Sequence, residues 1–307
     1  MSIFYKMAYS WSGKDNNEVF QFAGQLSCVA VVGFNFDENG LISVPNGFSG
    51  LLPLKQQGLE ILPVVQNQVQ GAFSGGLLEG ILANSGKRRQ LVGNCQKLIE
   101  QYGLRGIHLN LENYRGDAAL LTQLVEELYH LLRPKAEVSM ALPAKTKITT
   151  WFNGYDYQAL TKVTDWTLLM SYDLHWSGGP PGPVGSLKWM GEVADYAIDL
   201  GWRREQLVLG IPLYGYDWPE NGRGKVVLNH QVRALQGAKG ITGRWHSQYG
   251  ESNMTYKEGD IVHQVWYQDD GAVAAKVDLA KQKGLRGVGF WRLGFQFPGV
   301  WQALSKV

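Results

Sequence analysis

One short segment places three polar side chains at alternate positions of an otherwise apolar stretch. It reads Arg105-Gly106-Ile107-His108-Leu109-Asn110-Leu111-Glu112-Asn113. Because side chains alternate along a β-strand, His108, Asn110 and Glu112 would share one face of the strand. A carboxyl group held among apolar neighbours has a raised pKa, which suits it to donate a proton near neutral pH. The spacing therefore indicates either a catalytic acid, Glu112, or a polar network that satisfies itself internally.

Strand-like apolar runs and helical patterns alternate along the whole chain. The strand-like runs cover residues 4–10, 28–36, 61–66, 106–112, 137–143, 166–173, 207–214 and 288–293. The clearest helical patterns are 87–102, 117–133, 187–200 and 272–283, each followed by Gly or Pro. This order predicts an α/β fold, a closed (β/α)8 TIM barrel forming a single domain over 1–307. The alternation lapses at 219–262, which predicts a short insertion between strands seven and eight that forms a cleft wall.

The active sites of such barrels lie at the C-terminal ends of the strands. Glu112 ends the fourth strand-like run, so we expect its side chain at the mouth of the barrel. His108 and Asn110 would lie behind it, inside the barrel.

The composition excludes several classes of partner. Of the 307 residues, 45% are hydrophobic and 18% are charged, which is typical of a folded globular protein. The net charge is +2 and the longest basic run is Lys87-Arg88-Arg89, so we expect no nucleic-acid partner. The 11 tryptophans are too many to bury easily, and they indicate an open aromatic surface suited to flat ligands such as sugars.

Several kinds of site and segment are not expected. We expect no signal peptide, no transmembrane segment, no membrane partner and no repeated wall-binding module. Cys28 and Cys95 lie in apolar runs and are expected to be buried thiols. The histidines lack metal-ligand spacing, and nucleotide-binding and serine-hydrolase motifs are missing, so we expect no metal and no cofactor. A monomer is the expected state.

The polar segment resembles the fourth-strand signature of family 18 glycoside hydrolases, Asp-Gly-x-Asp-x-Asp-x-Glu, in which the final Glu is the proton donor. Met170-Ser171-Tyr172-Asp173 is similar to the family's sixth-strand motif, Met-x-Tyr-Asp. Residues 210–215 resemble its seventh-strand motif, and Gly289-Phe290-Trp291 resembles its eighth. Residues 142–146, 175–183 and 290–294 are similar to bacterial spore-cortex-lytic N-acetylglucosaminidases of this family. The resemblance covers essentially the whole chain.

This resemblance implies a substrate-assisted mechanism with net retention of configuration. The 2-acetamido oxygen of the substrate attacks the anomeric carbon while Glu112 protonates the leaving oxygen, and Glu112 later activates water. The resemblance further implies that Tyr172 donates a hydrogen bond to the acetamido oxygen and that Asp173 binds the distorted sugar. Trp291 would form the floor under the ring, and Tyr214 would line the same subsite.

The segment departs from the family pattern at two positions. The family has Asp two residues before the acid, whereas this chain has Asn110, which can accept the acetamido N–H but carries no charge. Four residues before the acid the family has Asp or Asn, whereas this chain has His108. The missing charge is expected to cost about 1.5–3 kcal/mol, or about ten- to a hundredfold in rate. We expect neutral His108 to hydrogen-bond to Asn110 and to fix the orientation of its amide.

Three further residues are candidates for sugar contacts outside these motifs. His175 and Trp176, in a Gly/Pro-rich loop, are expected to form subsite walls. Asp217, just past the seventh strand, lies where a loop could face ligand or merely cap a turn.

These observations together predict a glycosidase acting on an N-acetylglucosamine-containing polysaccharide. The expected target is the β-1,4 bonds of spore-cortex peptidoglycan, cleaved by a spore- or cell-wall-associated enzyme. A chitinase or an endo-β-N-acetylglucosaminidase would share every catalytic residue. A lectin-like member without catalysis is the third alternative, because Asn110 and His108 depart from the family pattern. Glu112 argues against the lectin, since a binder has little need for a buried acid.

Overall fold

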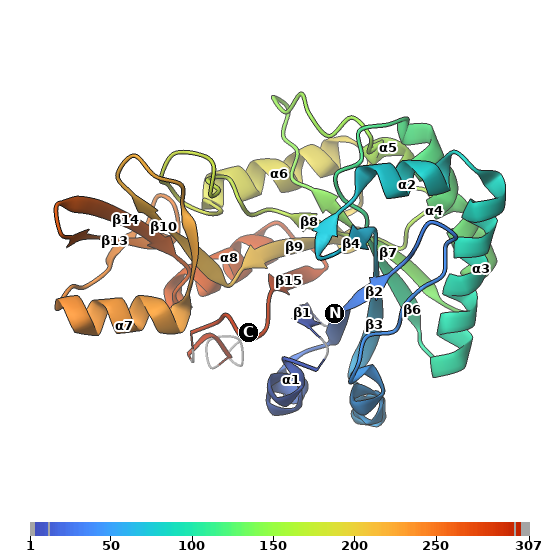
Figure 1. Ribbon diagram of the computed structural model, residues 1–307, viewed down its shortest axis with the longest axis horizontal. Helices are drawn as coiled ribbons and strands as arrows, with labels where there is room; N and C mark the ends of the chain where they lie inside the picture. The colour runs from blue at the N-terminus through green and yellow to red at the C-terminus, as the bar shows by residue number, and fades with distance from the viewer. Residues whose placement is uncertain (1–3, 12, 298, 302–307) are drawn as a thin grey trace.

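Eight parallel strands close into a barrel at the centre of the molecule (Figure 1). The computed structural model describes residues 4–11, 13–297 and 299–301. The barrel strands are β1 (Tyr5–Trp11), β2 (Cys28–Asn35), β3 (Glu60–Gln66), β6 (Gly106–Asn110), β7 (Glu137–Pro143), β8 (Trp166–Met170), β9 (Leu207–Pro212) and β15 (Gly287–Trp291). Strands consecutive in this order pair in parallel, and β1 pairs with β15 to close the ring. The predicted TIM barrel, with an insertion between its seventh and eighth strands, is confirmed.

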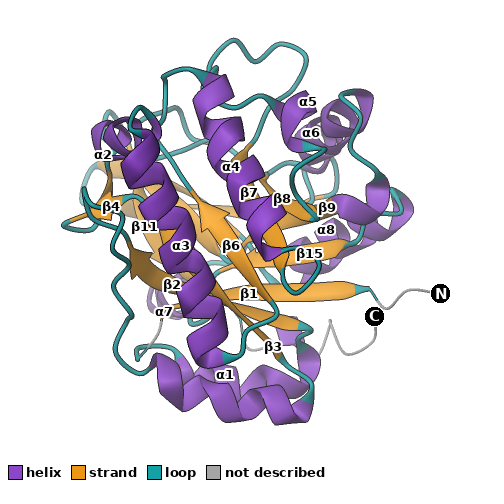
Figure 2. Ribbon diagram, turned by 90° about the vertical axis from the view of Figure 1, so that its right-hand side faces the viewer, coloured by secondary structure: helices purple, strands orange, loops and turns teal. Residues whose placement is uncertain are grey.

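Helices cover the outside of the barrel. They are α1 (Asn16–Phe22), α2 (Gly75–Leu82), α3 (Ser85–Tyr102), α4 (Ala118–Leu132), α5 (Tyr157–Leu160), α6 (Leu187–Asp199) and α8 (Asp270–Gln282), with 3₁₀ segments at Ala23–Gln25, Phe48–Gln57 and Arg204–Gln206. Figure 2 shows α3 and α4 side by side over the strands. The side chains of Asn84 and Asp117 cap the first turns of α3 and α4 by accepting main-chain N–H groups. Leu121, Leu124 and Leu128 form the buried stripe of α4.

The barrel wall separates two apolar cores. The inner core is enclosed by the strands and includes Leu62, Trp166 and Leu168. The outer core lies between strands and helices, and it contains Ile107 and Leu109 of β6 together with Leu111 just beyond its end. The alternation of side chains therefore turns the polar residues of β6 toward the inside of the barrel.

A five-stranded antiparallel sheet with helix α7 (Asn229–Lys239) lies beside the barrel (Figure 1). Its strands are β10 (Tyr214–Pro219), β11 (Lys225–Leu228), β12 (Arg244–His246), β13 (Glu251–Glu258) and β14 (Ile261–Tyr267), in the order β11-β10-β14-β13-β12. The inserted segment is longer than the predicted 219–262, because the sheet extends from Tyr214 to Tyr267. It begins directly after β9 because residues 214–219 pair with β11 and β14 instead of forming a loop.

A buried ion pair joins this sheet to the barrel. Lys276 of α8 is completely buried, and its Nζ lies 3.3 Å from Oε1 of Glu251 on β13 and 2.9 Å from the carbonyl oxygen of Gly250. The carboxylate of Glu251 also accepts the main-chain N–H groups of Val184, at 2.8 Å, and Gly185, at 2.7 Å. The bonds therefore tie α8, β13 and the loop after β8 to one another.

The fold accounts for three features of the sequence. Cys28 and Cys95 are buried free thiols, as predicted. The basic run 87–89 lies on α3, where Arg88 is buried against Glu127 with Nε 2.9 Å from Oε1. In the part of the chain that the structure describes, no helix has the length and apolar character needed to cross a bilayer.

Candidate active site

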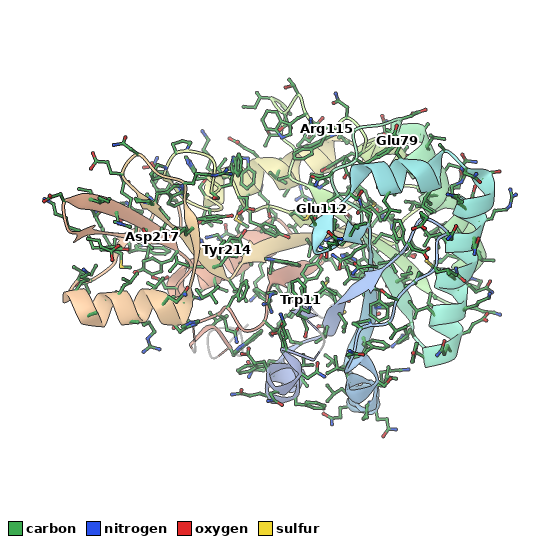
Figure 3. The ribbon with its side chains drawn as sticks, viewed as in Figure 1. Trp11, Glu79, Glu112, Arg115, Tyr214 and Asp217 are labelled. Atoms are coloured by element: carbon green, nitrogen blue, oxygen red, sulfur yellow. The ribbon has the colours of Figure 1, made fainter. Side chains whose placement is uncertain are left out.

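A cavity of about 230 Å³ opens at the carboxyl ends of the barrel strands. Figure 3 shows Glu112, Trp11 and Tyr214 around this mouth of the barrel. The cavity brings together six of the predicted site residues: Asn110, Glu112, Tyr172, Asp173, Tyr214 and Trp291. These residues come from the fourth, sixth, seventh and eighth strands or the segments that follow them, so only the closed barrel makes them neighbours.

Glu112 lies two residues beyond the end of β6, whereas the sequence pattern extended the strand to this residue. The strand ends at Asn110 because its pairing with β7 stops at Leu109 and its pairing with β3 stops at Asn110. Burial raises the pKa of Glu112 to about 7. The carboxyl of Asp173 adds to this rise in pKa, and a side-chain hydrogen bond with Asn110 opposes it. The carboxyl thus stays protonated up to near neutral pH, as a general acid requires.

The side-chain amide of Asn110 is only partly satisfied. Asn110 is 3% exposed, and its side chain hydrogen-bonds to Glu112. Its Oδ1 is buried and has no hydrogen-bond partner among the described residues. A buried carbonyl oxygen without a partner costs about 1–3 kcal/mol, so this atom is suited to accept an N–H from a ligand in the cavity.

Tyr172 and Asp173 follow β8, which ends before them, whereas the expected strand reached Asp173. The strand ends at Met170 because its pairing with β7 stops there and its pairing with β9 stops at Leu169. Asp173 itself has a left-handed backbone, with a φ of 61°. The ring of Tyr172 packs over β9 at Gly210, where a Cβ would lie 3.1 Å from Cε1 of Tyr172. Oδ1 of Asp173 accepts the hydroxyls of Tyr214, at 2.6 Å, and Tyr216, at 3.1 Å. Desolvation raises the pKa of Asp173, and these two hydrogen bonds lower it in part.

Two tryptophans border the cavity. Trp291 ends β15, and its ring meets that of Tyr9 edge to face with centroids 5.0 Å apart. Trp11 ends β1 and is 38% exposed, with the guanidinium of Arg292 5.5 Å above its ring centroid. Such apolar ring faces suit stacking against a sugar.

The predicted hydrogen bond between His108 and Asn110 is wrong. Both ring nitrogens of His108 have other partners: Nε2 lies 2.8 Å from the hydroxyl of Tyr9, and Nδ1 lies 2.9 Å from Oγ of Ser139. The ring stacks on Trp166 and is completely buried below the cavity, so it does not contact bound sugar. Burial lowers the pKa of His108 to about 3, which keeps it neutral.

Asp217 does not line the cavity either, and Figure 3 shows it away from Glu112. On β10, alternation turns Tyr214 and Tyr216 toward Asp173 and turns Asp217 to the other face of the sheet. There its Oδ1 lies 2.8 Å from Nδ1 of His263, and its Oδ2 accepts the hydroxyl of Tyr256 at 2.6 Å. The carboxylate is therefore engaged within the insertion.

The loop residues His175 and Trp176 also lie outside the cavity lining. Nδ1 of His175 is 2.9 Å from the carbonyl oxygen of Pro180 and closes its own loop. Trp176 is 51% exposed, so its ring is available to a longer ligand that extends beyond the cavity.

The sequence reasoning missed the contribution of the first and third strands. The missed lining residues include Tyr9, Trp11, Gln66, Gln68 and Phe73. A signal was available, because Tyr9 and Gln66 lie at the C-terminal ends of predicted strands, where barrel sites gather. Gln68 and Phe73 belong to a small hairpin, β4 (Gln68–Val69) and β5 (Ala72–Phe73). Its strands are two residues long, too short to produce a periodic pattern in the sequence.

Over residues 4–11, 13–297 and 299–301, no cluster of three or more His, Cys, Asp or Glu side chains could hold a metal ion. The cavity lining itself offers carboxyl, amide and hydroxyl groups.

Comparison with known protein families matches residues 8–296 to Glycosyl hydrolases family 18. The chain belongs to this family. The predicted resemblance is confirmed, and the family 18 protein described here is a glycosidase.

Individual relatives are similar over nearly all of the family 18 chain. It is 28% identical to a cortical fragment-lytic enzyme of Bacillus subtilis (strain 168), covering 91% of this chain and 67% of that protein. The crystal structure of the Bacillus cereus spore cortex-lytic enzyme SleL superposes with a TM-score of 0.91 at 24% identity, covering 99% and 74% of the two chains. A chitinase from Chromobacterium violaceum superposes with a TM-score of 0.91 at 25% identity, covering 99% and 98%.

Proposed function

We propose that this protein is a retaining glycosidase that cleaves β-1,4 bonds of N-acetylglucosamine-containing peptidoglycan by substrate-assisted catalysis. One observation carries the proposal. Glu112, whose pKa is raised by burial to about 7, and Asn110 line the same cavity, and Oδ1 of Asn110 is buried and unpartnered among the described residues. Glu112 can donate a proton and Oδ1 of Asn110 can accept a hydrogen bond, so the pair suits a substrate with both a leaving oxygen and an acetamido N–H.

In the first step, the acetamido oxygen attacks the anomeric carbon and the glycosidic C–O bond breaks. Glu112 gives its proton to the departing oxygen, and Oδ1 of Asn110 accepts the acetamido N–H as the oxazolinium ring forms. Tyr172 donates its hydroxyl to the acetamido oxygen. Holding the reacting groups in this pose removes several kcal/mol from the barrier, because the attack is intramolecular.

In the second step, Glu112 is a carboxylate and takes a proton from water. The water attacks the anomeric carbon and the acetamido group re-forms, so the product retains its configuration. The cavity lining offers one other carboxyl, Asp173, whose Oδ1 already accepts two tyrosine hydroxyls. That carboxyl is better suited to holding the sugar than to attacking it. Trp291 supplies the apolar floor.

Two relatives support peptidoglycan as the substrate. The relatives named above include a cortical fragment-lytic enzyme and a spore cortex-lytic enzyme, and the chain resembles them over 91% and 99% of its length. We place this protein in the spore or cell wall on the same grounds. A chitinase superposes equally well, so chitin is the competing substrate.

Mass spectrometry of digested spore-cortex peptidoglycan, compared with chitin oligomers, tests the proposal. We expect products ending in N-acetylglucosamine from cortex with the wild-type protein and none with Glu112→Gln. Proton NMR should show the β-anomer first, and a thiazoline analogue of the bicyclic intermediate should inhibit. Cleavage of chitin alone would overturn the substrate assignment. Binding without Glu112-dependent cleavage of any substrate would overturn the enzymatic proposal and favour a lectin.

A further inference from the structure

The main chain at Glu112 lies beyond the hydrogen-bond ladder of the barrel. Pairing between β3 and β6 ends at Gln66 opposite Asn110, and pairing between β6 and β7 ends at Leu109. At the next residue, Asn113, the chain turns away with a left-handed φ of 58°. The hydroxyl of Tyr155 donates to the carbonyl oxygen of Leu111 at 2.8 Å, but this bond does not reach the main chain of Glu112 itself. A carboxyl that must donate a proton to a defined atom would be poorly aimed from a main chain without such bonds of its own.

A buried asparagine supplies the missing pairing. The side chain of Asn67, the residue after β3, makes two reciprocal bonds with the main chain of Glu112: Oδ1 accepts the N–H at 2.9 Å, and Nδ2 donates to the carbonyl oxygen at 2.8 Å. A side-chain amide has the donor and acceptor of a peptide group, so it continues the strand pairing where the backbone of β3 stops. Asn67 is completely buried.

The same amide holds the hairpin that lines the cavity. The second N–H of Nδ2 donates to the carbonyl oxygen of Ser74 at 2.9 Å, directly after β5. With Oδ1 on an N–H and Nδ2 on two carbonyls, only one orientation of this amide satisfies its partners. Nδ2 of Asn113 donates to the carbonyl oxygen of Phe73 at 3.1 Å. A Cβ at Gly75 would lie 2.2 Å from the carbonyl oxygen of Asn113, so the two segments are in close contact.

We propose that Asn67 is a positioning residue for the catalytic acid, because its amide fixes the main chain of Glu112 and joins it to the hairpin β4–β5. The inference rests on the proposed function and adds a residue that touches no substrate. The hairpin residues Gln68 and Phe73 line the cavity. The amide of Asn67 therefore holds both the main chain of Glu112 and the hairpin that forms one wall of the cavity.

Steady-state kinetics on a 4-methylumbelliferyl N-acetylglucosaminide substrate test this role in Asn67→Ala, with rates taken per folded protein from near-UV circular dichroism. We expect kcat to fall about ten- to a hundredfold with KM within about threefold, because the acid loses its aim while the cavity contacts of Tyr214 and Trp291, which Asn67 does not hold, remain. The alkaline limb of the pH profile should move to lower pH, since a loosened Glu112 regains solvent and its pKa falls.

The isosteric variant Asn67→Asp gives the opposite shift. It keeps an acceptor for the N–H of Glu112 but sets a carboxylate oxygen against two carbonyls, so kcat should fall. The added negative charge raises the pKa of Glu112 and moves the alkaline limb to higher pH. If Asn67 only stabilised the fold, the alkaline limb would not move in either variant. If Asn67→Ala does not fold, the limb of Asn67→Asp decides: an upward shift supports the inference and an unmoved limb overturns it.

Asn94→Ala is the matched control. Nδ2 of Asn94 on α3 holds the carbonyl oxygen of Gly40 at 2.7 Å in the helix layer, so its loss should lower stability without changing kcat or either limb. An Asn67→Ala protein with kcat within about twofold of an active wild type overturns the inference alone. A wild-type protein without Glu112-dependent turnover overturns the proposed function, and the catalytic role of Asn67 with it.

Discussion

Two glutamates of this protein are withdrawn from water, and their carboxyl groups are satisfied to very different degrees. Glu251 is completely buried and accepts two main-chain N–H groups, with the ammonium of Lys276 3.3 Å away. Glu112 lies in an open cavity with a side-chain hydrogen bond from Asn110, and its pKa is raised to about 7. The carboxylate of Glu251 thus has several hydrogen-bond and charge partners, whereas the carboxyl of Glu112 has few.

The hydrogen-bond partners of a buried carboxyl decide whether it serves the structure or is free to exchange a proton. The charge of Glu251 is compensated on all sides, so this residue ties the insertion to the barrel and has no capacity for a ligand. The proton of Glu112 is retained because its charged form is poorly stabilised, which makes the residue a donor at the same pH. The contrast between Glu112 and Glu251 leads to four expected outcomes.

The largest effect is expected from Glu112→Gln. The amide cannot donate a proton, so kcat should fall by about 10²–10⁴-fold. Because burial raises the pKa from 4.5 to about 7, the wild type loses stability as pH rises through that window, and the neutral variant does not. Its melting temperature should therefore equal the wild-type value at low pH and exceed it at pH 8. An active variant would remove Glu112 from the chemistry.

The same substitution at Glu251 should act on stability. Glu251→Gln leaves Lys276 buried without its counter-charge and sets an amide N–H against a main-chain N–H, so we expect a loss of about 3–5 kcal/mol. Denaturant unfolding measures this loss, with Glu112→Gln as the matched control. A variant as stable as the wild type would show that the buried pair does not tie the two regions together.

A gain of activity is expected from Asn110→Asp. The carboxylate accepts the acetamido N–H with a full charge and offsets the positive intermediate, which should raise kcat about ten- to a hundredfold. It also replaces a donor to Glu112 by a like charge, so the alkaline limb should move to higher pH. Comparison of kcat over pH 5–9 provides the measurement. A rate equal to or below the wild type would contradict the proposed role of Asn110.

The smallest effect is the pH dependence of the wild type. Glu112 must be protonated to donate, so kcat/KM should fall about tenfold per pH unit above pH 7, the region of its raised pKa. Initial rates in constant-ionic-strength buffers measure the limb. A limb near pH 4.5 would mean that the carboxyl is solvated like an ordinary glutamate and would remove the contrast with Glu251.

The strands and the polar segment could be predicted because their signals are local. Apolar runs bounded by turns and capped helices reproduce the barrel elements to within a few residues. Alternation placed His108 and Asn110 inside the barrel, and the motifs predicted that Tyr172, Asp173, Tyr214 and Trp291 belong with Glu112. Periodicity indicates which way a side chain points, but not what it meets.

The errors at His108 and Asp217, and the missed role of Asn67, concern partners that come from elsewhere in the chain. His108 pairs with Tyr9 and Ser139, which are 99 and 31 residues away in sequence, and not with its near neighbour Asn110. Asp217 was expected in a loop, but strand pairing within the insertion turns it toward His263. Asn67 carries no motif, and its contact with Glu112 spans 45 residues.

The order of residue types along the chain determined the barrel strands and the inward-facing polar residues of β6, because these depend on periodicity over a few residues. Closure of the barrel decided the partners of these residues. It set which hydroxyls bond to the ring nitrogens of His108, which amide holds the main chain of Glu112, and that Oδ1 of Asn110 is left without a partner among the described residues. Those outcomes depend on hydrogen-bond distances between segments far apart in sequence. Only the folded chain brings the segments within that range.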